Sequence, residues 1–311
     1  MKSKILNFLL KSFLFLLCAS FSSVLFAQYA VNGNATQDNC NCYTLTPNIN
    51  TAVGSVWNIN LIDLTNSFDF SFNVFLGCSD GGADGMAFGL QPVSTSVGIN
   101  GNGMGLGTIA PSIGVFLDTY QNTAPDSDPW EDHISINSNG DVDHLSANNL
   151  AGPVNASSTN TNIEDCAWHD LQIVWTYNSP TSQTLEAFFD GVLRVTYTGD
   201  LINTVFSGNP NVYWVFTAST GGATNEHKFC TALNANFGTD ITTQTACSNT
   251  PINFADSSTS FGSIVNWQWD FGDGSATVNG TNTTSYTYTA DGNYNAELII
   301  TDGSGCKDSI K

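Results

Sequence analysis

An alternation of apolar and polar side chains recurs along this chain and limits it to an all-β fold. FDFSFNVFL, residues 68–76, places a large apolar side chain at nearly every second position, as a half-buried strand does. LQIVWTY, residues 171–177, repeats this pattern. Because no segment sustains a helical period, the strands must bury their apolar faces against one another.

Turn signals indicate how the strands are connected. TLEAFFDGVLRVTY is predicted to be a hairpin with Asp190-Gly191 at its turn, and HISINSNGDVDH has a turn at Asn139-Gly140. Long stretches of Gly, Asn, Ser and Thr, such as residues 95–108 and 148–162, lie between other strands. Many short strands joined by long loops predict a sandwich or jelly roll of two antiparallel sheets.

The first 27 residues have the form of a secretory signal peptide. Lys2, Lys4 and Lys11 accompany an apolar run, residues 13–26, which ends at the small residue Ala27. Cleavage after Ala27 would remove three of the seven basic residues and no acidic residue. We therefore expect a protein that is secreted or displayed at the cell surface.

The chain is strongly acidic, with a formal net charge of −20. After the signal segment, the only basic residues are Arg194, Lys228, Lys307 and Lys311. Nucleic acid would find too few cations for binding by counterion release, and no later apolar run is long enough to insert into a membrane. The acidity suits solubility or the binding of divalent cations.

Seven cysteines follow the signal segment without a CxxC pair or a zinc-like spacing. In an exported protein such scattered cysteines predict disulfides, here with one cysteine left over. Spacing alone does not determine the pairing. The pairs that we consider are Cys247–Cys306 in the C-terminal unit, Cys230 with Cys42 or Cys40, and Cys78–Cys166 by elimination.

A change of pattern near residues 236–245 marks a domain boundary. Beyond it lie WQWDFGDGS, residues 267–275, then Tyr288 and the Gly292-Asn293-Tyr294 turn. This segment resembles a PKD domain, which implies an immunoglobulin-like sandwich that serves as a folded spacer on surface proteins. We expect it to be truncated, because the strand that should follow Cys306 has barely begun at Lys311.

The stretch GVFLDTYQNTAPDSDPWEDHISI, residues 114–136, concentrates oxygen ligands after an apolar strand. Asp118 ends the strand, and a loop through Asp126 or Asp128 can fold back onto it. Two carboxylates, the Asn122 side-chain oxygen, a backbone carbonyl and water would suit calcium. His133 adds a nitrogen that suits a transition metal. A solvated acidic loop explains the same spacing equally well.

Three companion segments accompany the acidic stretch: GGADGMAFGLQ at residues 81–91, GNGMGLG at 101–107 and WVFTASTGGATNEH at 214–227. Together the four resemble, in family order, the segments of the L-type lectins, which are the legume lectin and concanavalin A superfamily. The chain is most similar to lectin modules of secreted Bacteroidota proteins, in which a PKD domain often follows. The resemblance implies a concanavalin A-like jelly roll that binds glycans with the help of Ca²⁺.

The resemblance also implies roles for individual residues in sugar binding. Asp84 matches an aspartate that accepts hydrogen bonds from sugar hydroxyls and that tends to follow a cis peptide bond in the family. Asn122 matches an asparagine that contacts both sugar and calcium. The implied carbohydrate-binding residues are Asp84, one backbone N–H among Gly103, Met104 and Gly105, then Asn122, and Gly221 and Gly222 in the last loop.

The implied metal ligands come from the acidic stretch. Plant members of the family bind a second, transition-metal ion with a glutamate two residues before the aspartate, where this chain has Phe116. We therefore expect that second site to be lost or weak, and His133 either touches a metal or braces the loop. The implied calcium ligands are Asp118, the Tyr120 carbonyl, Asn122 and Asp128, with Asp126 as a rival of Asp128.

Aromatic and histidine side chains are divided by their context. Tyr120 and Trp130 are candidates to pack on a sugar ring. Tryptophans in strand-like segments are expected in the core, and the remaining histidines are interpreted as strand-edge structure. The expected core tryptophans are Trp57, Trp168, Trp175 and Trp214, and the strand-edge histidines are His144, His169 and His227.

Catalysis is the main alternative, because the same jelly roll hosts glycoside hydrolases. A retaining hydrolase needs two carboxylates about 5–5.5 Å apart. None of the five glutamates forms the expected motif, and adjacent Glu164 and Asp165 would face opposite sides of a strand. We predict a non-enzymatic lectin module at residues 28–237 and a PKD domain at 238–311. A structural adhesion module with a degenerate sugar site remains a further alternative.

Overall fold

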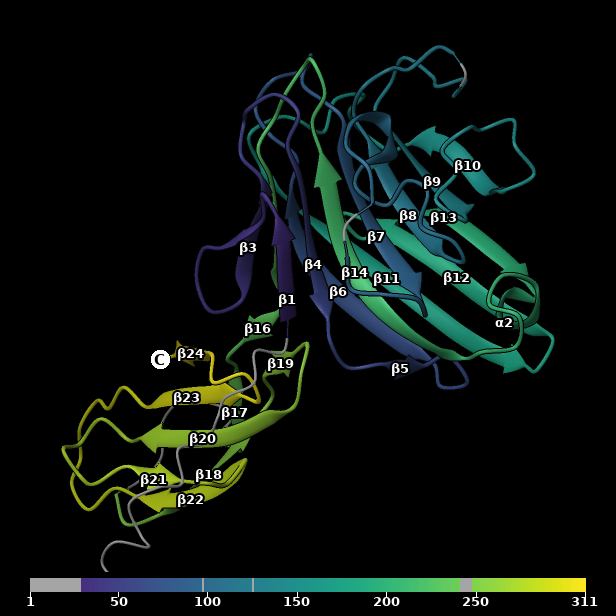
Figure 1. Ribbon diagram of the computed structural model, residues 1–311. Helices are drawn as coiled ribbons and strands as arrows, with labels where there is room; N and C mark the ends of the chain where they lie inside the picture. Colours follow the sequence, from purple (N-terminus) through teal and green to yellow (C-terminus); the bar gives the residue numbers. More distant parts are fainter. Residues whose placement is uncertain (1–28, 97, 125, 241–247) are drawn as a thin grey trace, which may run out of the picture.

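The computed structural model describes residues 29–96, 98–124, 126–240 and 248–311; the predicted signal segment lies outside them. The described residues form two β-sandwiches with very little helix (Figure 1). The larger sandwich contains β1 to β15, and the smaller contains β16 to β24. The prediction of an all-β fold is confirmed.

The larger sandwich consists of two antiparallel sheets. Strands from distant parts of the chain lie side by side, such as β4 and β14, which is the long-connection topology of a jelly roll. One sheet has the order β1(Tyr29–Gly33), β4(Val53–Asn58), β14(Asn211–Ser219), β7(Gly85–Gln91), β8(Ile113–Asp118), β9(His133–Ser138), β10(Asn149–Asn155), with β5(Ile62–Asp63) beside β14. The other has the order β13(Val192–Gly199), β12(Ser182–Phe189), β11(Trp168–Ser179), β6(Phe68–Phe75), β15(His227–Thr231), β3(Cys42–Thr46), β2(Thr36–Gln37).

Aromatic side chains of both sheets fill the space between them. On β6, Phe72 and Val74 are buried while their neighbours face solvent, which confirms the predicted alternation. The Phe72 ring lies 5.9 Å from that of Phe88 and 4.7 Å from that of Phe216, both on the opposing sheet. Burying each such ring stabilises the fold by roughly 1.5–3 kcal/mol.

Three of the four tryptophans expected in the core are fully buried, namely Trp57, Trp175 and Trp214. The prediction is wrong for Trp168, which is 47% exposed. Trp168 is the first residue of β11, and its ring packs on Phe75 at a centroid distance of 5.6 Å. The strand pattern therefore identified the strand but not the side of the sheet that this residue faces.

The two predicted turns form, with different consequences. Asp190 and Gly191 have positive φ values of 50° and 75° and connect β12 directly to β13. Asn139 and Gly140 have φ values of 60° and 63°, yet β10 begins only at Asn149. The residues between, 141–148, form a loop that is tied back to the rest of the sandwich at Ser138, whose N–H donates to the carbonyl of Asn148 at 2.8 Å.

The smaller sandwich packs two further sheets around a separate core with Trp269, Phe271 and Phe254 at its centre. The N–H groups of Gly272 and Ser275 donate to the Asp270 and Asp273 carboxylates of the WDFGDG segment, which cap its turns. One sheet comprises β17(Phe237–Thr239), β18(Pro251–Asp256) and β22(Thr283–Thr287). The other comprises β21(Val278–Asn279), β20(Ile264–Asp270), β23(Glu297–Asp302) and β24(Lys307–Ile310).

A partly buried aromatic side chain of the smaller sandwich packs against the core of the larger one. The short strands β16(Leu233–Asn234) and β19(Thr259–Ser260) pair, and Phe261 follows directly. The Phe261 ring lies 4.6 Å from Phe70, 5.2 Å from Phe72 and 5.0 Å from Trp214. The two sandwiches therefore share apolar contacts at this junction.

The disulfide pattern confirms two predicted pairs and corrects the third. Cys42–Cys230 and Cys78–Cys166 are bonded, but Cys306 pairs with Cys40 across a sequence separation of 266 residues. The predicted Cys247–Cys306 bond is therefore wrong, and Cys247 itself lies outside the described residues. Docking of the smaller sandwich brings Cys306, which precedes β24, to the segment before β3.

A cleft of about 620 Å³ lies at the same junction, lined by residues of β6 and β11, by the paired strands β16 and β19, and by Phe261. None of its lining residues belongs to the acidic stretch. The candidate site is therefore located by its side chains rather than by the size of this cleft. Among the described residues, no helix is long and apolar enough to cross a membrane.

Candidate functional site

The acidic stretch and its companion segments meet at the end of the larger sandwich that is opposite the junction (Figure 1). Gly85 at the start of β7 pairs with Asp118 of β8 on one side and with Ser219 of β14 on the other. Antiparallel pairing at these positions brings together the loops that leave the three strands. Asp84 therefore lies between the start of the acidic loop and the start of the last loop.

Asp84 is held by its backbone, while its carboxylate is buried. The Ala83–Asp84 peptide bond is cis, as the family resemblance implied. The Asp84 N–H donates to the Ser219 carbonyl at 2.9 Å, and its carbonyl accepts from the Thr119 N–H at 3.2 Å. Asp84 Oδ2 is buried and has no hydrogen-bond partner among the described residues. Burial raises the pKa of this carboxyl to about 6.

Carboxylates of the acidic loop accept hydrogen bonds from backbone N–H groups of the same loop. The Tyr120 N–H donates to Asp118 Oδ1 at 3.0 Å, and the Asn122 N–H donates to Asp128 Oδ2 at 2.8 Å. Asn122 Nδ2 lies 3.3 Å from the Tyr120 carbonyl oxygen. The fold thus brings together Asp118, Tyr120, Asn122 and Asp128; their role as calcium ligands stays a prediction.

Asp126, the rival of Asp128, has different partners. Its Oδ2 accepts a hydrogen bond from Asn102 Nδ2 in the Gly-rich loop, and its carbonyl accepts from the His144 N–H at 3.0 Å. Asp126 therefore connects two neighbouring loops to the acidic one. The carboxylate that meets Asn122 and the histidines belongs to Asp128.

The Gly-rich loop is fastened to β14 beside Asp84. It contains a short 3₁₀ turn, η1(Gly101–Gly103); the Met104 side chain behind it is buried. The hydroxyls of Thr217 and Ser219 donate to carbonyls of this loop at 2.7 and 2.6 Å. The N–H groups of Met104 and Gly105 already donate to loop carbonyls at 2.9 Å, so we retain Gly103 as the candidate donor toward a sugar.

The last loop lies directly against Asp84. A Cβ atom added to Gly221 would lie 3.3 Å from Asp84 Oδ2. The Gly221 and Gly222 carbonyls accept hydrogen bonds from Thr51 N–H at 3.2 Å and Asn50 Nδ2 at 2.8 Å. A side chain at position 221 would therefore crowd the Asp84 carboxylate, and glycine avoids this contact.

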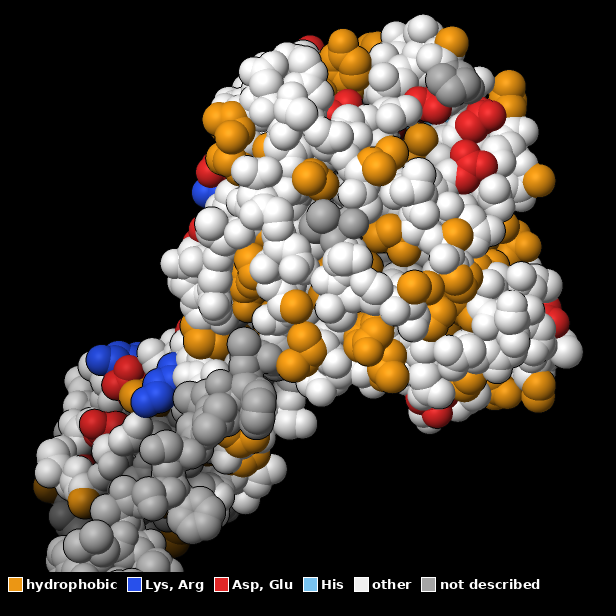
Figure 2. Space-filling view, in the orientation of Figure 1, with side chains coloured by type: hydrophobic (Ala, Val, Ile, Leu, Met, Phe, Trp, Pro, Cys, Tyr) orange, Lys and Arg blue, Asp and Glu red, His pale blue; other side chains and the backbone are white. Residues whose placement is uncertain are grey.

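Negative charge dominates this end of the molecule. Burial, and next the charge of Asp128, raise the pKa of Asp118 well above its ordinary value. Figure 2 shows acidic side chains gathered toward the upper right of the larger sandwich, with no Lys or Arg beside them in that view. Within the described ranges, no Lys or Arg forms an ion pair with Asp84, Asp118 or Asp128. An external cation would relieve this repulsion.

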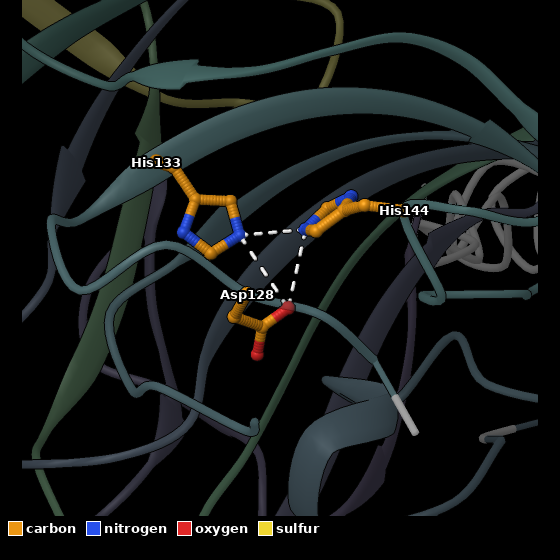
Figure 3. A group of neighbouring side chains, drawn as sticks. All are labelled: Asp128, His133 and His144. Atoms are coloured by element: carbon orange, nitrogen blue, oxygen red, sulfur yellow. Dashed lines mark hydrogen bonds and ion pairs between the residues drawn. The ribbon is translucent and has the colours of Figure 1, made fainter. Parts of the chain in front are cut away.

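Two histidines complete the cluster, and only one was predicted as a possible metal ligand. His133 Nε2 lies 3.9 Å from Asp118 Oδ2. It also lies 3.9 Å from Asp128 Oδ1 (Figure 3). His144 Nε2 lies 3.2 Å from the same Asp128 oxygen and 2.9 Å from His133 Nε2. His144 is therefore not a strand-edge residue: it comes from the loop of residues 141–148, which folds back over β9. Burial and the neighbouring His144 lower the pKa of His133 to about 4.

Glu164 is a buried carboxyl beneath the site that sequence reasoning missed. Its Oε1 accepts from Asn225 Nδ2, which also donates to the Ser79 carbonyl at 2.9 Å. Burial, followed by the negative charge of Asp132, raises the pKa of Glu164 to about 8. No local sequence signal marks this residue, since Asn225 is 61 positions away.

The oxygen set of the acidic loop fits calcium. It offers the Asp118 and Asp128 carboxylates, the Tyr120 carbonyl and, after rotation of its amide, Asn122 Oδ1. Calcium takes six to eight such oxygen ligands, with water completing the shell. Asp128 Oδ1 is buried and has no hydrogen-bond partner among the described residues, which is the condition that a bound cation would satisfy.

Comparison with known families agrees with this geometry. A family model described as the legume lectin β-barrel domain matches residues 22–233, more than half of the chain. The chain belongs to this lectin family. A PKD domain model matches residues 235–311. The larger sandwich is thus a legume-type lectin domain, and a PKD domain follows it.

Curated relatives of the lectin domain include a bacterial adhesin. The serine-rich adhesin for platelets of Staphylococcus aureus strain MRSA252 is 30% identical over 220 residues, which is 62% of this chain and 15% of the adhesin. The same adhesin in strain MSSA476 is 29% identical over 215 residues, or 62% of this chain and 9% of that protein. The chain therefore spans only a small part of these relatives.

Solved structures with the same fold include plant lectins and the exoplasmic/lumenal domain of VIP36. Lectin I-B4 of Griffonia simplicifolia, in a metal-free form, has a TM-score of 0.54 and 21% identity, covering 68% of this chain and 93% of the lectin. Lectin II of Ulex europaeus has a TM-score of 0.51 and 22% identity, covering 65% of this chain and 90% of the lectin. The exoplasmic/lumenal domain of VIP36, in a Ca²⁺/Man-bound form, has a TM-score of 0.50 and 16% identity. It covers 65% of this chain and 80% of the VIP36 chain. These similarities establish the fold of the lectin domain.

Proposed function

We propose that the lectin domain binds glycans in a calcium-dependent manner, as the recognition module of a secreted or surface-displayed adhesion protein of Bacteroidota type. The observation that carries this proposal is the convergence of four loops around two buried carboxylate oxygens, Asp84 Oδ2 and Asp128 Oδ1, that lack hydrogen-bond partners among the described residues. A sugar hydroxyl would satisfy the first oxygen and a calcium ion the second.

Calcium would act by fixing the loop rather than by taking part in a reaction. The ion would offset the repulsion between Asp118 and Asp128 and hold Asn122 next to Asp84. Sugar hydroxyls would then meet acceptors at Asp84 and Asn122 and a backbone N–H at Gly103. Orienting these groups beforehand lowers the entropic cost of binding.

Exposed aromatic rings beside the site suit the apolar face of a sugar. Tyr120 is 40% exposed and Trp130 is 70% exposed. Such rings pack against a pyranose while its hydroxyls bind polar groups. We expect each site to bind weakly and several sites on one surface to give useful avidity.

Three further observations support an adhesive role outside the cell. The relatives include a named adhesin, a structure of the same fold is described as Ca²⁺/Man-bound, and three disulfides suit an oxidising compartment. Binding without catalysis is part of the proposal. Among the glutamates, Glu226 pairs with Lys228, Glu297 pairs with Lys311, and Glu164 is buried.

A glycan array tests the proposal with the whole chain, in calcium and after chelation. Binding should require calcium, return when calcium is added back, and disappear in Asp84→Asn and Asp118→Asn. Asp69→Asn is the matched control, because Asp69 is an exposed aspartate on β6 whose carboxylate accepts from Gln172.

Three outcomes would contradict the proposal in different ways. Binding that resists the chelator would reject the calcium mechanism but keep a lectin. Release of reducing ends from a bound polysaccharide would reject the non-enzymatic function. A folded protein that binds no glycan on a broad array would leave only a structural adhesion module.

A further inference from the structure

Three ligand atoms converge beside the calcium loop, and the sequence brings them from three separate segments. Asp128 lies in the acidic loop, His133 begins β9, and His144 lies in the loop that delays β10 (Figure 3). Their side chains are 1%, 2% and 5% exposed, respectively. The cluster is thus a buried site formed by converging loops rather than a solvated acidic surface.

Backbone groups orient the His133 ring and hold the main chain of His144 in place. His133 Nδ1 lies 3.1 Å from the Glu131 carbonyl oxygen, and since a carbonyl only accepts, this nitrogen carries the ring proton. The neutral ring therefore directs the lone pair of Nε2 inward. The His144 N–H donates to the Asp126 carbonyl, and its own carbonyl accepts from Asn149 Nδ2 at 2.8 Å. Both main-chain polar groups of His144 are therefore hydrogen-bonded.

Hydrogen bonds among the three groups leave one buried oxygen unsatisfied. Because His133 Nε2 carries no proton in this tautomer, it accepts in the 2.9 Å contact with His144 Nε2. A hydrogen bond from His144 to His133 then leaves Asp128 Oδ1 without a partner, as observed among the described residues. A cation at the centre would satisfy all three atoms at once.

We propose that Asp128, His133 and His144 bind one Zn²⁺ ion, with His144 supplying the ligand that the family's glutamate provides elsewhere. The three ligand atoms lie 2.9, 3.2 and 3.9 Å from one another. Tetrahedral zinc with ligands at about 2.0–2.2 Å separates them by about 3.3–3.5 Å. Water would supply the fourth ligand of the shell, because Asp118, whose Oδ2 lies 3.9 Å from His133 Nε2, is not part of the group of mutually close ligand atoms.

The ligand types select the metal. Two imidazole nitrogens suit zinc and disfavour calcium and magnesium, which prefer oxygen ligands. Phe116 cannot coordinate any metal; its ring is buried in an apolar cluster with Met104 and Leu106. The expectation that the second metal site is lost because of Phe116 therefore changes: an imidazole from a different loop replaces the missing carboxylate.

Metal binding to the whole chain tests this inference directly. We would strip the purified, disulfide-bonded protein with a chelator, add Zn²⁺ or Co²⁺, and measure the bound metal after dialysis. One equivalent of zinc per chain is expected, and cobalt should give the visible absorption of a tetrahedral site that one equivalent of zinc abolishes. His144→Gln should weaken zinc binding by at least about tenfold, since even the loss of an outer partner costs 10–100-fold.

His169→Gln is the matched control. His169 also contacts two carboxylates, Asp190 at 2.9 Å and Asp165 at 3.2 Å, but these aspartate side chains are 46% and 37% exposed and it lies on the opposing sheet. Zinc binding should be unchanged in this variant. The cobalt spectrum of the wild type requires no variant and so does not depend on whether His144→Gln folds.

The inference shares Asp128 with the proposed calcium loop but does not rest on glycan binding. Calcium-dependent glycan binding without zinc retention or a tetrahedral cobalt spectrum would overturn the zinc site alone. Zinc retention in a protein that binds no glycan would overturn the proposed function alone. Zinc binding that persists in both His144→Gln and His133→Gln would also overturn the site.

Discussion

The two ends of the lectin sandwich are stabilised by different interactions. At the loop end, Asp118 and Asp128 are buried together without a Lys or Arg partner among the described residues. At the junction end, Phe261 packs against the aromatic core and the Cys40–Cys306 disulfide joins the two domains covalently. The junction is held by its own contacts, whereas the loop end buries like charges that the proposed cation would offset.

This difference separates the part of the molecule that supports from the part that recognises. Buried like charges cost free energy, and such violations of ordinary packing gather at binding sites. The apolar and covalent junction offsets that cost by holding the scaffold. We therefore expect changes at the junction to act on stability under all conditions, and changes at the loop end to act according to the cation and the pH.

Removing the interdomain disulfide should have the largest effect. Cys40→Ser with Cys306→Ser opens a cross-link with a sequence separation of 266 residues. The free energy of unfolding should fall by about 4 kcal/mol, because the unfolded chain regains the freedom that the bond removes. Urea unfolding checks this, and separate transitions for the two domains should appear. A single unchanged transition would contradict the covalent role of the junction.

Removing the shared ring should come next. Phe261→Ala leaves a cavity among Phe70, Phe72 and Trp214 and should cost about 3 kcal/mol. Urea midpoints of the whole chain provide the measurement. Val265→Ala is the control, since Val265 is 59% exposed on the same domain and should change stability by less than about 0.5 kcal/mol. Equal effects of the two variants would show that the ring does not fasten the domains.

At the loop end, calcium should stabilise the protein, and Asp118→Asn should make the protein insensitive to calcium. Calcium at a hundredfold excess over its Kd should add about 2.7 kcal/mol to the free energy of unfolding. Asp118→Asn should abolish this gain and should raise the stability of the chelated protein, because it removes a buried charge beside Asp128. Thermal unfolding in calcium and in chelator measures both. If the chelated variant is less stable than the chelated wild type, repulsion between Asp118 and Asp128 does not destabilise the protein.

The smallest effect concerns pH. The pKa of Glu164 is about 8 in the folded protein and near 4.5 ordinarily, so the fold favours its protonated form. Its contribution to stability is complete below pH 4.5 and is lost as the pH rises through 8. Between pH 7 and 8 the chelated protein should lose about 1 kcal/mol. This window avoids the histidines, which titrate near pH 6.5 when unfolded.

Glu164→Gln provides the comparison for that pH dependence. The neutral amide keeps the shape of the side chain and cannot titrate, so the urea midpoint should become less dependent on pH between 7 and 8. If the urea midpoint changes equally with pH in the variant and the wild type, Glu164 is not the cause of the pH dependence.

Local patterns predicted most of the fold. The alternation in residues 68–76 identified β6, and Asp190-Gly191 identified the hairpin of β12 and β13, because both signals lie within a few neighbouring residues. The WDFGDG segment likewise identified the PKD domain. The Cys40–Cys306 bond was not predictable in the same way, since it depends on how two domains dock.

The residues of the candidate site likewise divide into those that local motifs predicted and those that only the tertiary fold reveals. Four motifs in family order pointed to Asp84, Asp118 and Asn122, and the fold brings them together, although their roles stay predictions. His144 was missed because Asn139-Gly140 reads as a tight hairpin turn, whereas eight further residues precede β10. Only the path of that loop reveals an imidazole beside Asp128.

The Cys40–Cys306 bond has a mechanical consequence for a domain pair on a surface. A pull applied along β24 reaches Cys306 within a few residues and passes through sulfur to Cys40, just before β3. The connecting peptide between β15 and β17 is bypassed and bears little load. Tension would thus enter the lectin domain at its junction end, far from the loops of the proposed binding site, and the geometry of those loops would be preserved while the molecule is under strain.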